Sequence, residues 1–549
     1  MGGARFRFGR PIRSIAAVLG GSVVDFEVAG VCSGRQVSGL AALQKKPLSI
    51  KKPGDYLAAL QAEHVVADVE ERRDELLARL ERAAGQAGGR IDLDDALIEE
   101  TVYMTEQPTP VVGSFASEFL QLPDALLSLV MKRQLKFFPV LEGARLKAAF
   151  VGVRDGLSEG EALVREGYER VLAARGNDAV FFFKRDLATR LADKLPMLER
   201  VTYQRGLGSM AEKSRRVEAL TRELCAMTRQ DRPADEKAAA EIARLCYADL
   251  VTEVVKEFPE LQGLMGGVYA RRDGLDERVA LGLEQFYLPV GPKSPVPATI
   301  EGALVSLAGK LDSLVANFAV GNVPTGNADP FALRRQALGA IRIALEQQLP
   351  VDLTRAVSAA CRQMAVAHDA AKTEADVLEF LWGRAQSLFE EKGFRVDEIR
   401  AIKAGGLASL KRTYLRLAAI HAVRANPDFE PLAAAFKRAS NILRQARFPL
   451  SDAQSPERGL LREPAETALF DALLSMEGRV SERLVEEDYE TGLRALVAIK
   501  PHLDLFFDKV MVMAEDAQVR SQRLRLLAKL VRLFNAVADL SEIQSPSSN

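Results

Sequence analysis

Cysteine and histidine are scarce in this sequence of 549 residues, and both shortages restrict its chemistry. The four cysteines are widely scattered and include no Cys-x-x-Cys pair, which argues against a structural zinc site and against a disulfide framework. The four histidines leave few groups for acid–base catalysis near neutral pH. Scattered thiols fit a reducing compartment, so we expect a cytoplasmic protein.

An excess of one charge sign is also missing. Lysine and arginine together number 74, and aspartate and glutamate together number 75. No global basic field therefore draws the chain to nucleic acid or to an anionic membrane. Any contact with a polyanion must come from a local group of cations.

Long apolar runs and nucleotide-binding motifs are absent as well. No run of about 18 uncharged apolar residues occurs, so we expect no membrane-spanning helix. The basic, apolar start of the chain lacks the cleavage pattern of an export signal. Neither a GxxxxGK[ST] phosphate loop nor a Rossmann fingerprint is visible, so we expect no ATP site of these types.

The distribution of strand and helix signals predicts a multidomain, predominantly α-helical fold. The length is too great for one core and suggests roughly three or four domains. Residues 1–155 combine alternating strand patterns, such as RFRF at 5–8, with a charged helix at about 67–85, which predicts an α/β portion. Helix-length segments then follow almost without interruption. The expected further parts are a helical domain at 156–350, a helical linker at 351–424, a second helical domain at 425–540 and a disordered tail at 541–549.

The segment PTGNADPFALRRQALGAIRI (324–343) predicts a well-started helix. Asn327 and Asp329 can cap free amide groups, and Pro330 suits the first helical turn because its φ angle is preset. Apolar residues then follow at helical spacing and predict a buried side: Phe331, Leu338, Ile341 and Leu345.

Three arginines of this helix are candidates for binding. Arg334, Arg335 and Arg342 can share one edge of the helix. They would face either an anion, such as an RNA phosphate, or carboxylates of a neighbouring domain. The pattern leaves both alternatives open.

Two later segments place cations beside an apolar stripe. In NPDFEPLAAAFKRASNILRQ (426–445), Asp428 can cap the helix and Pro431 suits its first turn. The apolar stripe consists of Leu432, Phe436, Ala439 and Leu443. The candidate RNA contacts of this helix are Lys437, Arg438, Asn441 and Arg444.

The second of these segments is AEDAQVRSQRLRLLAKLVRLFNAVADL (514–540). Its buried side is predicted to contain Leu527, Leu530, Val531, Phe534 and Val537. Arg525, Lys529 and Arg532 share another face and could contact phosphates. Such rows often serve only as a solvated surface, and Glu515 and Asp516 lie close by.

A His368-Asp369 doublet is the only hint of a metal-dependent hydrolase. Phosphohydrolases of the HD type bind a metal ion through such a doublet together with further histidine and aspartate ligands. No second histidine lies at a plausible distance upstream, and the surrounding VAHDAA resembles the junction between two helices. We therefore interpret the doublet as a surface pair and expect no metal site.

Several long stretches resemble the beta subunit of bacterial glycyl-tRNA synthetase. They are ADLVTEVVKEFPELQGLMGGVYA (248–270), LAGKLDSLVANFAVGNVPTGNADPFALRRQALGAIRI (307–343) and FFDKVMVMAEDAQVRSQRLRLLAKL (506–530). NPDFEPLAAAFKRASNIL (426–443) is similar to the anticodon-binding region of that family. The amino-terminal FGRPIRSIAAVLGGSVVDFEVAG also fits, so the resemblance runs over nearly the whole chain.

The resemblance implies a subunit that binds tRNA(Gly) and has no catalytic residues or cofactor of its own. In this family a separate class II alpha subunit binds glycine, ATP and magnesium and performs the reaction. Two alpha and two beta chains assemble, and the beta chain supplies most of the grip on tRNA. Residues 425–540 are similar to the anticodon-binding domain of arginyl-type synthetases.

The resemblance also implies a degenerate HD-like domain between about 160 and 350. Its remnants of the metal site are Asp249, which follows Ala248 where an active enzyme has the doublet, and Asp312. The histidines are missing there, so we expect a role near the acceptor end of tRNA in place of hydrolysis. The chain departs from the family pattern by lacking a longer amino end and by having AALQ at 41–44 in place of a His-Arg-Phe turn.

Our hypothesis is therefore a tRNA-binding synthetase subunit. Two alternatives are a metal-dependent HD-type phosphohydrolase and a helical scaffold that does not bind RNA.

Overall fold

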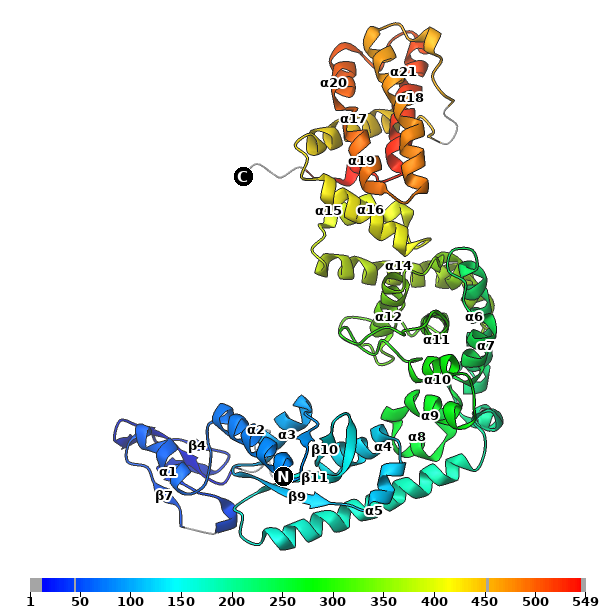
Figure 1. Cartoon of the computed structure of the whole chain (residues 1–549). Coiled ribbons are helices and arrows are strands. Elements are labelled where there is room, and N and C mark those ends of the chain that lie inside the picture. Colours follow the sequence, from blue (N-terminus) through cyan, green and yellow to red (C-terminus); the bar gives the residue numbers. More distant parts are fainter. Residues whose placement is uncertain (1–11, 44–45, 451–453, 545–549) are drawn as a thin grey trace. The chain divides into compact units, whose positions relative to one another are not determined.

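The computed structural model describes residues 12–43, 46–450 and 454–544, and helices predominate in it (Figure 1). It divides into two compact units. Unit 1 comprises Met1–Thr189 and Glu253–Leu261, and unit 2 comprises Arg190–Thr252 and Gln262–Asn549. The predicted class, multidomain and mostly α-helical with an α/β amino-terminal portion, is confirmed. The units are coarser than the domains expected from the sequence, whose borders stay predictions. In the described ranges no helix is both long and apolar enough to span a bilayer.

Short strands around a small core form the first part of unit 1. β1 (Ile15–Ala16) lies parallel to β5 (Val31–Gly34), and β5 pairs antiparallel with β4 (Glu27–Val28). Two further antiparallel pairs are β2 (Val18–Leu19) with β3 (Ser22–Val23) and β6 (Gln36–Val37) with β7 (Leu48–Ser49). Buried residues, one of them from α1 (Tyr56–Ala62), form the core: Val37, Leu40, Ile50, Leu60 and Val65. The strand expected at 5–8 lies outside the described residues.

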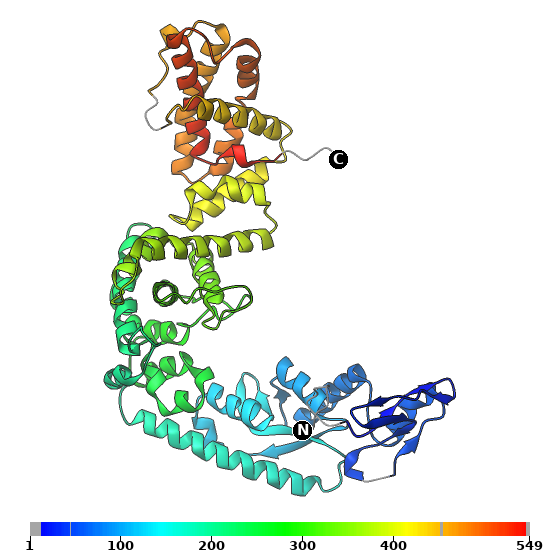
Figure 2. The same cartoon turned by 180° about the vertical axis from the view of Figure 1, so that it is seen from behind.

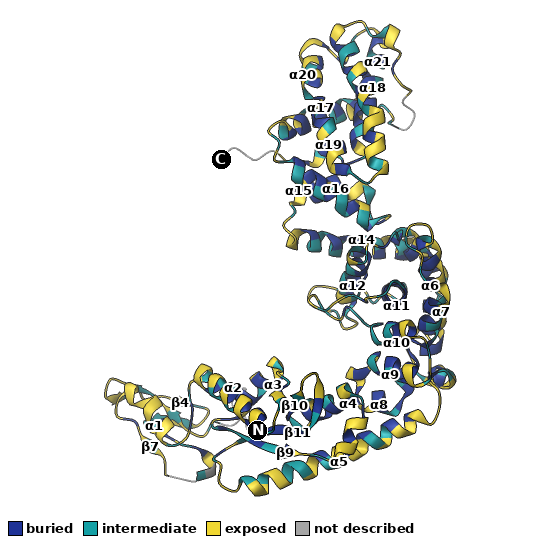
Figure 3. Cartoon of the chain, viewed as in Figure 1, coloured by how far each residue is buried: buried dark blue, intermediate teal, exposed yellow. Residues whose placement is uncertain are grey.

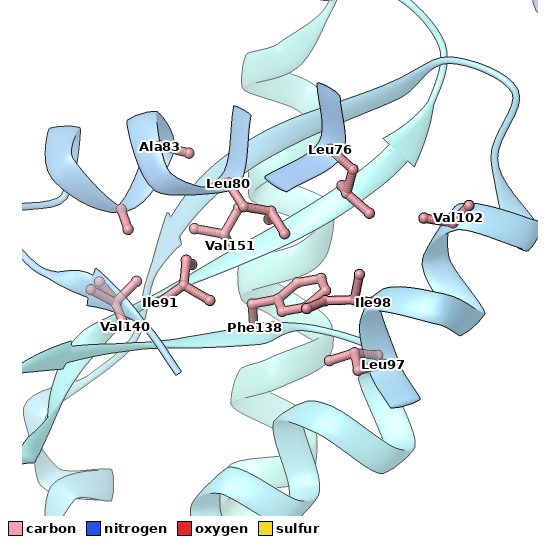
Figure 4. Packing of buried hydrophobic residues seen from close by; sticks show 12 residues of the cluster. Leu76, Leu80, Ala83, Ile91, Leu97, Ile98, Val102, Phe138, Val140 and Val151 are labelled. Atoms are coloured by element: carbon pink, nitrogen blue, oxygen red, sulfur yellow. The ribbon is translucent and has the colours of Figure 1, made fainter. Parts of the chain in front are cut away.

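A four-stranded antiparallel sheet forms the second part of unit 1. Its order is β8 (Arg90–Ile91), β10 (Phe138–Glu142), β11 (Arg145–Asp155) and β9 (Pro108–Ser114). The helices α2 (Val69–Gln86) and α3 (Asp95–Met104) bury their apolar sides on one face (Figure 4). The core there includes Leu76, Leu80, Ile98, Phe138, Val140 and Val151. The charged helix expected at 67–85 is therefore confirmed, and the Asp68 carboxylate caps it by accepting the amides of Glu70 and Glu71.

The long helix α5 (Glu161–Leu187) packs on the opposite face of the sheet, whose residues alternate along the strands with those of this core. Phe150 and Gly152 flank Val151 on β11, and the Tyr168 ring of α5 lies directly over Gly152. Tyr168 also contacts Phe137, whose ring stacks on Phe150 at 4.6 Å between centroids. Alternation along β11 thus buries both faces of the sheet. The remaining helices of unit 1 are α4 (Asp124–Leu129) and α8 (Glu253–Glu257).

Unit 2 begins with a bundle around α11 (Ile300–Ala319), which is buried on nearly all sides (Figures 2 and 3). Neighbouring helices cover α11 so fully that its polar residues Ser306, Lys310 and Asn317 are buried as well. The surrounding helices are α6 (Met210–Thr228), α7 (Glu236–Leu245), α9 (Leu264–Arg272), α10 (Glu277–Glu284), α12 (Leu333–Glu346), α13 (Leu353–Arg362) and α14 (Ala370–Glu391). We call this group the α11 bundle.

The start of α12 differs from the expectation. The helix begins at Leu333 and not at Pro330, because Ala332 adopts a left-handed conformation (φ 54°) that does not continue into a right-handed helix. Asp329 still acts as a cap, accepting the amides of Leu333 at 2.8 Å and Arg334 at 3.0 Å. Phe331 therefore lies outside the helix and is exposed, so the predicted burial of this residue is wrong.

The carboxyl-terminal part of unit 2 is helical throughout. Its elements are α15 (Val396–Ala401), α16 (Leu410–Val423), α17 (Phe429–Gln445), α18 (Pro464–Val485), α19 (Tyr489–Val497), α20 (Lys500–Lys509) and α21 (Ala517–Asn535). The last five pack together around buried rings of Phe436, Phe506 and Phe534. Of the tail expected to be disordered at 541–549, Ser541 and Glu542 form part of a short 3-10 turn, and 545–549 lie outside the described residues.

Candidate nucleic-acid interface

Exposed cations follow the outer side of α17. The helix buries its predicted stripe of Leu432, Phe436, Ala439 and Leu443 against the other carboxyl-terminal helices. Lys437, Arg438 and Arg444 project from the opposite side and are exposed. Within the described ranges, no carboxylate forms an ion pair with any of the three. These charges are thus available to a polyanion.

The beginning of α17 departs from the expectation in one detail. Asp428 occupies the cap position, but its carboxylate accepts no amide hydrogen bond. Asp428 is itself in a helical conformation (φ −84°, ψ −10°), whereas a side chain caps best from an extended residue. The predicted side-chain cap is therefore wrong, although the helix begins where the sequence places it.

An aromatic ring supports one of the three cations. The guanidinium carbon of Arg438 lies 4.4 Å from the centroid of the Phe507 ring on α20. Stacking of this kind restrains a guanidinium while its N–H groups stay free to donate hydrogen bonds in the plane. Arg438 is therefore held in a position suited to a phosphate or a base edge.

A cleft of about 500 Å³ opens beside Arg444. Its other walls come from α17, α21 and the chain on either side of them: Ser440, Leu443, Phe448, Leu450, Val531, Asn535, Asp539 and Ser541. Asn441, the remaining candidate on α17, is half-buried. The volume is typical of sites for small organic molecules, so the cleft is large enough for a nucleobase.

The cations of α21 have a different environment. Lys529 is only 7% exposed, and its Nζ lies 2.5 Å from the Glu477 carboxylate on α18. Arg525 is partly buried and lies 3.9 Å from the Glu457 carboxylate, and Arg532 is half-buried. Acidic residues distant in sequence thus pair with Arg525 and Lys529. Any tRNA contact of these three residues stays a prediction.

A buried ion pair fixes α21 to the start of α18. Arg523 donates to the Glu466 carboxylate and, at 2.7 Å, to the Met511 carbonyl oxygen. Glu466 also accepts the amides of Arg462 at 2.7 Å and Glu463 at 3.1 Å. A buried pair with its remaining hydrogen-bond capacity satisfied is tolerated, whereas removal of one partner leaves an uncompensated charge.

The arginines of α12 are mostly engaged within the α11 bundle. Arg342 pairs with Glu346 at 2.6 Å and donates to the carbonyl oxygens of Gly291 and Ser294. Arg334 donates to the Gly326 carbonyl oxygen at 2.7 Å. Arg335 is exposed and makes no such contact among the described residues. Arg334 and Arg342 thus contact groups of their own bundle, Arg335 stays available to an anion, and the choice between an RNA phosphate and carboxylates of a neighbouring domain stays a prediction.

The two remnant aspartates are buried, and both accept hydrogen bonds from neighbouring groups, although Oδ1 of Asp249 has no partner among the described residues. The Asp249 carboxylate accepts the amides of Gly263 at 2.5 Å and Gly266 at 3.1 Å, and burial raises its pKa to about 7 despite these bonds. Asp312 pairs with Lys213 at 2.8 Å and Arg216 at 2.6 Å. Burial would raise the pKa of Asp312, but the two cations outweigh it and lower the pKa. Both carboxylates thus serve the packing of the bundle.

His368 and Asp369 do not form a paired site. The Asp369 carboxylate caps α14 by accepting the Lys372 amide at 3.0 Å. His368 Nδ1 lies 2.8 Å from the Val366 carbonyl oxygen, while its Nε2 is buried without a partner. The structure confirms that the doublet lies at a helix start. In the described residues no group of three or more histidine, cysteine or acidic side chains is arranged to hold a metal ion.

Sequence reasoning missed the buried cations of the α11 bundle. Lys213 lies within the apolar stripe of α6, and Lys310 lies on α11, where nearly every residue is buried. A cation at a position that helical spacing assigns to the core was the available signal. The acids Glu466 and Glu477 gave no comparable signal, because only the tertiary fold brings them to α21.

Comparisons with known proteins first define the class of the carboxyl-terminal helices. A model of the DALR anticodon-binding domain matches residues 432–548, which contain most of α17 and all of α18 to α21. The chain therefore shares its last domain with proteins that carry this module. A model of the glycyl-tRNA synthetase beta subunit matches residues 1–404.

Curated relatives extend the match over the whole chain. The glycine–tRNA ligase beta subunit of Acidobacterium capsulatum is 39% identical in an alignment of 549 positions, gaps included, that covers 98% of this chain and 78% of that protein. The beta subunits of Myxococcus xanthus and Moorella thermoacetica are each 38% identical, over 98% and 99% of this chain and 78% of their own lengths. The chain belongs to the glycyl-tRNA synthetase beta subunit family.

Proposed function

We propose that this chain is the tRNA-binding subunit of a glycine–tRNA ligase and that the outer side of α17 holds tRNA(Gly). The observation that carries the proposal is the group Lys437, Arg438 and Arg444, exposed and unpaired within the described chain. They lie in the region that matches an anticodon-binding domain. Family membership supports the ligase role.

The reaction itself belongs to a partner chain in this proposal. A separate class II alpha subunit binds glycine, ATP and magnesium, two alpha and two beta chains assemble, and the complex acts in the cytoplasm. This chain accelerates the reaction by holding the tRNA so that its acceptor end reaches the alpha subunit. Such positioning removes part of the entropic cost of bringing the reactants together. The α11 bundle and Arg335 serve near the acceptor end.

Binding of glycine tRNA to a charge-reversed α17 tests the proposal. We expect Lys437→Glu, Arg438→Glu and Arg444→Glu together to weaken tRNA affinity by about tenfold or more, because phosphate contacts are replaced by repulsion. The slope of log affinity against log salt should also become shallower by about one for each phosphate that the variant no longer binds. Filter binding at several salt concentrations measures both quantities.

A matched control reverses three exposed arginines on other helices of the same domain. Arg479, Arg483 and Arg494 lie on α18 and α19, and their reversal changes the net charge by the same amount. We expect the control to change affinity by less than about threefold, since it adds long-range repulsion and breaks only the exposed ion pairs Arg483–Glu486 and Arg494–Glu490. Equal losses in both variants, or no loss in the α17 variant, would contradict the proposed interface.

A further inference from the structure

A cavity of about 230 Å³ lies inside the α11 bundle. It contains two lysines, and its other walls are aromatic and polar side chains: Tyr203, Tyr247, Phe286, Tyr287, Ser306, Ser313 and Gln336. The volume is below the range of sites for drug-sized ligands, so any occupant must be small. The tRNA-binding role of α17 assigns nothing to this cavity.

The charges around the cavity do not balance. Lys213 and Arg216 share a single carboxylate, that of Asp312. Lys310 has no carboxylate partner among the described residues. Asp249 lies next in sequence to the wall residue Leu250, but its Oδ2 is already occupied by two backbone amides. Two lysines therefore line a cavity whose wall, among the described residues, contains no acidic side chain.

Lys310 is fixed in this position. Its side chain is buried, and Nζ donates to the Tyr287 carbonyl oxygen at 3.2 Å. A β-carbon on Gly339 of α12 would lie 2.9 Å from Lys310 Cε, so the glycine leaves room for the lysine stem. Burial lowers the pKa of Lys310 to about 8, which still leaves the ammonium protonated at neutral pH. A buried cation without an anion is costly, and an anionic ligand would relieve that cost.

Hydrogen-bonding groups accompany the two ammonium groups. The Ser313 hydroxyl accepts from Lys213 at 2.9 Å and donates to the Gly309 carbonyl oxygen. The Gln336 side chain lines the cavity without a partner in the described chain. Lys213 Nζ lies 4.3 Å from the centroid of the Tyr203 ring, which holds the ammonium in place.

We propose that this cavity binds a phosphate monoester or inorganic phosphate through Lys213, Lys310 and Gln336. A compact dianion matches a small site with an excess of positive charge, and phosphate oxygens accept from both ammonium and amide donors. The phosphate can come from a free small molecule or from the terminal phosphate of an RNA chain. Both sources present the same chemical group.

Isothermal titration calorimetry of the full chain with inorganic phosphate, at constant ionic strength, tests the proposal. Lys310→Met removes the charge and keeps the length of the side chain, and we expect it to weaken phosphate binding by about tenfold or more. Lys293→Met is the matched control, because Lys293 is an exposed lysine on a loop of the same unit. That control should bind phosphate as the parent chain does.

A second variant covers the case in which Lys310→Met disturbs folding. Gln336→Glu keeps the shape of a half-buried side chain and places a negative charge at the cavity, so phosphate binding should weaken by several-fold or more. Circular dichroism checks that both variants keep their helix content. A second titration compares a short RNA that carries a 5′ phosphate with the same RNA after dephosphorylation.

Each outcome decides the proposal. Binding of inorganic phosphate that depends on Lys310 and Gln336 supports a free ligand. Preference for the phosphorylated RNA with the same dependence, without binding of inorganic phosphate, supports the end of an RNA chain. Absence of both, or binding that both variants retain, overturns the proposal. None of these outcomes alters the tRNA test on α17, because neither Lys310 nor Gln336 belongs to that surface.

Discussion

Lys437 and Lys529 lie on helices that pack against each other, α17 and α21, but their surroundings differ. Lys437 is exposed and unpaired within the described chain, whereas Lys529 is buried against Glu477, which lies 52 residues away in sequence. Helical spacing placed each cation beside an apolar stripe, but it did not predict that Lys529 is buried. It could not predict the acid that covers Lys529, because that contact exists only after α18 and α21 pack. The candidate RNA contacts on α17 therefore differ from those on α21 in burial and in ion pairing, not in residue type.

Lys310 allows a prediction of pH dependence. Its pKa in the folded chain is about 8, below the ordinary 10.5, so between these values the unfolded chain binds more protons than the folded chain. Stability must therefore rise as the pH increases from 8 to 10.5. At about 1.4 kcal/mol per pKa unit, the protonated lysine costs at most roughly 3 kcal/mol near pH 7.

Lys310→Met should remove this cost. We expect the variant to be more stable than the parent chain at pH 7 by up to about 3 kcal/mol, with a smaller difference at pH 9.5. Urea unfolding followed by fluorescence measures it, because the single tryptophan, Trp382, lies on α14 in the same bundle. Lys293→Met should show no such pH-dependent gain. If the difference in the free energy of unfolding between the parent chain and Lys310→Met were the same at pH 7 and pH 9.5, Lys310 would not be a buried cation without a compensating anion.

At the scale of elements, periodicity predicted the helices but not all of their ends. The stripe of α17 and the charged helix α2 follow directly from the spacing of apolar residues. The start of α12 does not follow from this spacing. The Asp329 carboxylate accepts the amides of the residues four and five positions later, and the left-handed Ala332 prevents the helix from beginning at Pro330. The helix α11 carries polar residues at helical spacing, Ser306, Lys310, Ser313 and Asn317, so periodicity alone did not reveal that other helices surround it.

The packing of α5 on the sheet of unit 1 depends on Gly152. A β-carbon there would lie 2.6 Å from the Tyr168 ring, closer than any ordinary contact. We expect Gly152→Ala to reduce the free energy of unfolding of unit 1 by about 1 to 3 kcal/mol, since the ring or the strand must shift. Thermal unfolding measured by circular dichroism detects the change.

The control for this variant is a glycine that has open space around it. Gly85 lies in α2, and a β-carbon added to it would have nothing within 4 Å, so Gly85→Ala should leave stability unchanged or raise it by about 0.5 to 1 kcal/mol. Combining Gly152→Ala with Tyr168→Leu should recover part of the loss. A neutral Gly152→Ala would show that α5 does not press on β11 as described.

At the scale of the whole molecule, the resemblance of long sequence stretches gave the family, which the comparisons show over nearly the full chain. Composition and spacing gave the fold class but no function, because balanced charge and few histidines fit many helical proteins. The candidate interface needed the structure, which leaves Lys437, Arg438 and Arg444 of α17 exposed and without ion pairs among the described residues and pairs Arg525 and Lys529 of α21 with acids. The cavity around Lys310 was found only there.

The central claim is that α17 holds tRNA while another chain makes the ester bond. The most direct test is steady-state glycylation by the alpha subunit together with this chain, carrying Lys437→Glu, Arg438→Glu and Arg444→Glu. We predict that KM for tRNA rises by about tenfold or more, while glycine-dependent ATP–pyrophosphate exchange, which needs no tRNA, keeps its rate. An unchanged KM for tRNA, or an equal loss in the exchange reaction, would contradict the account.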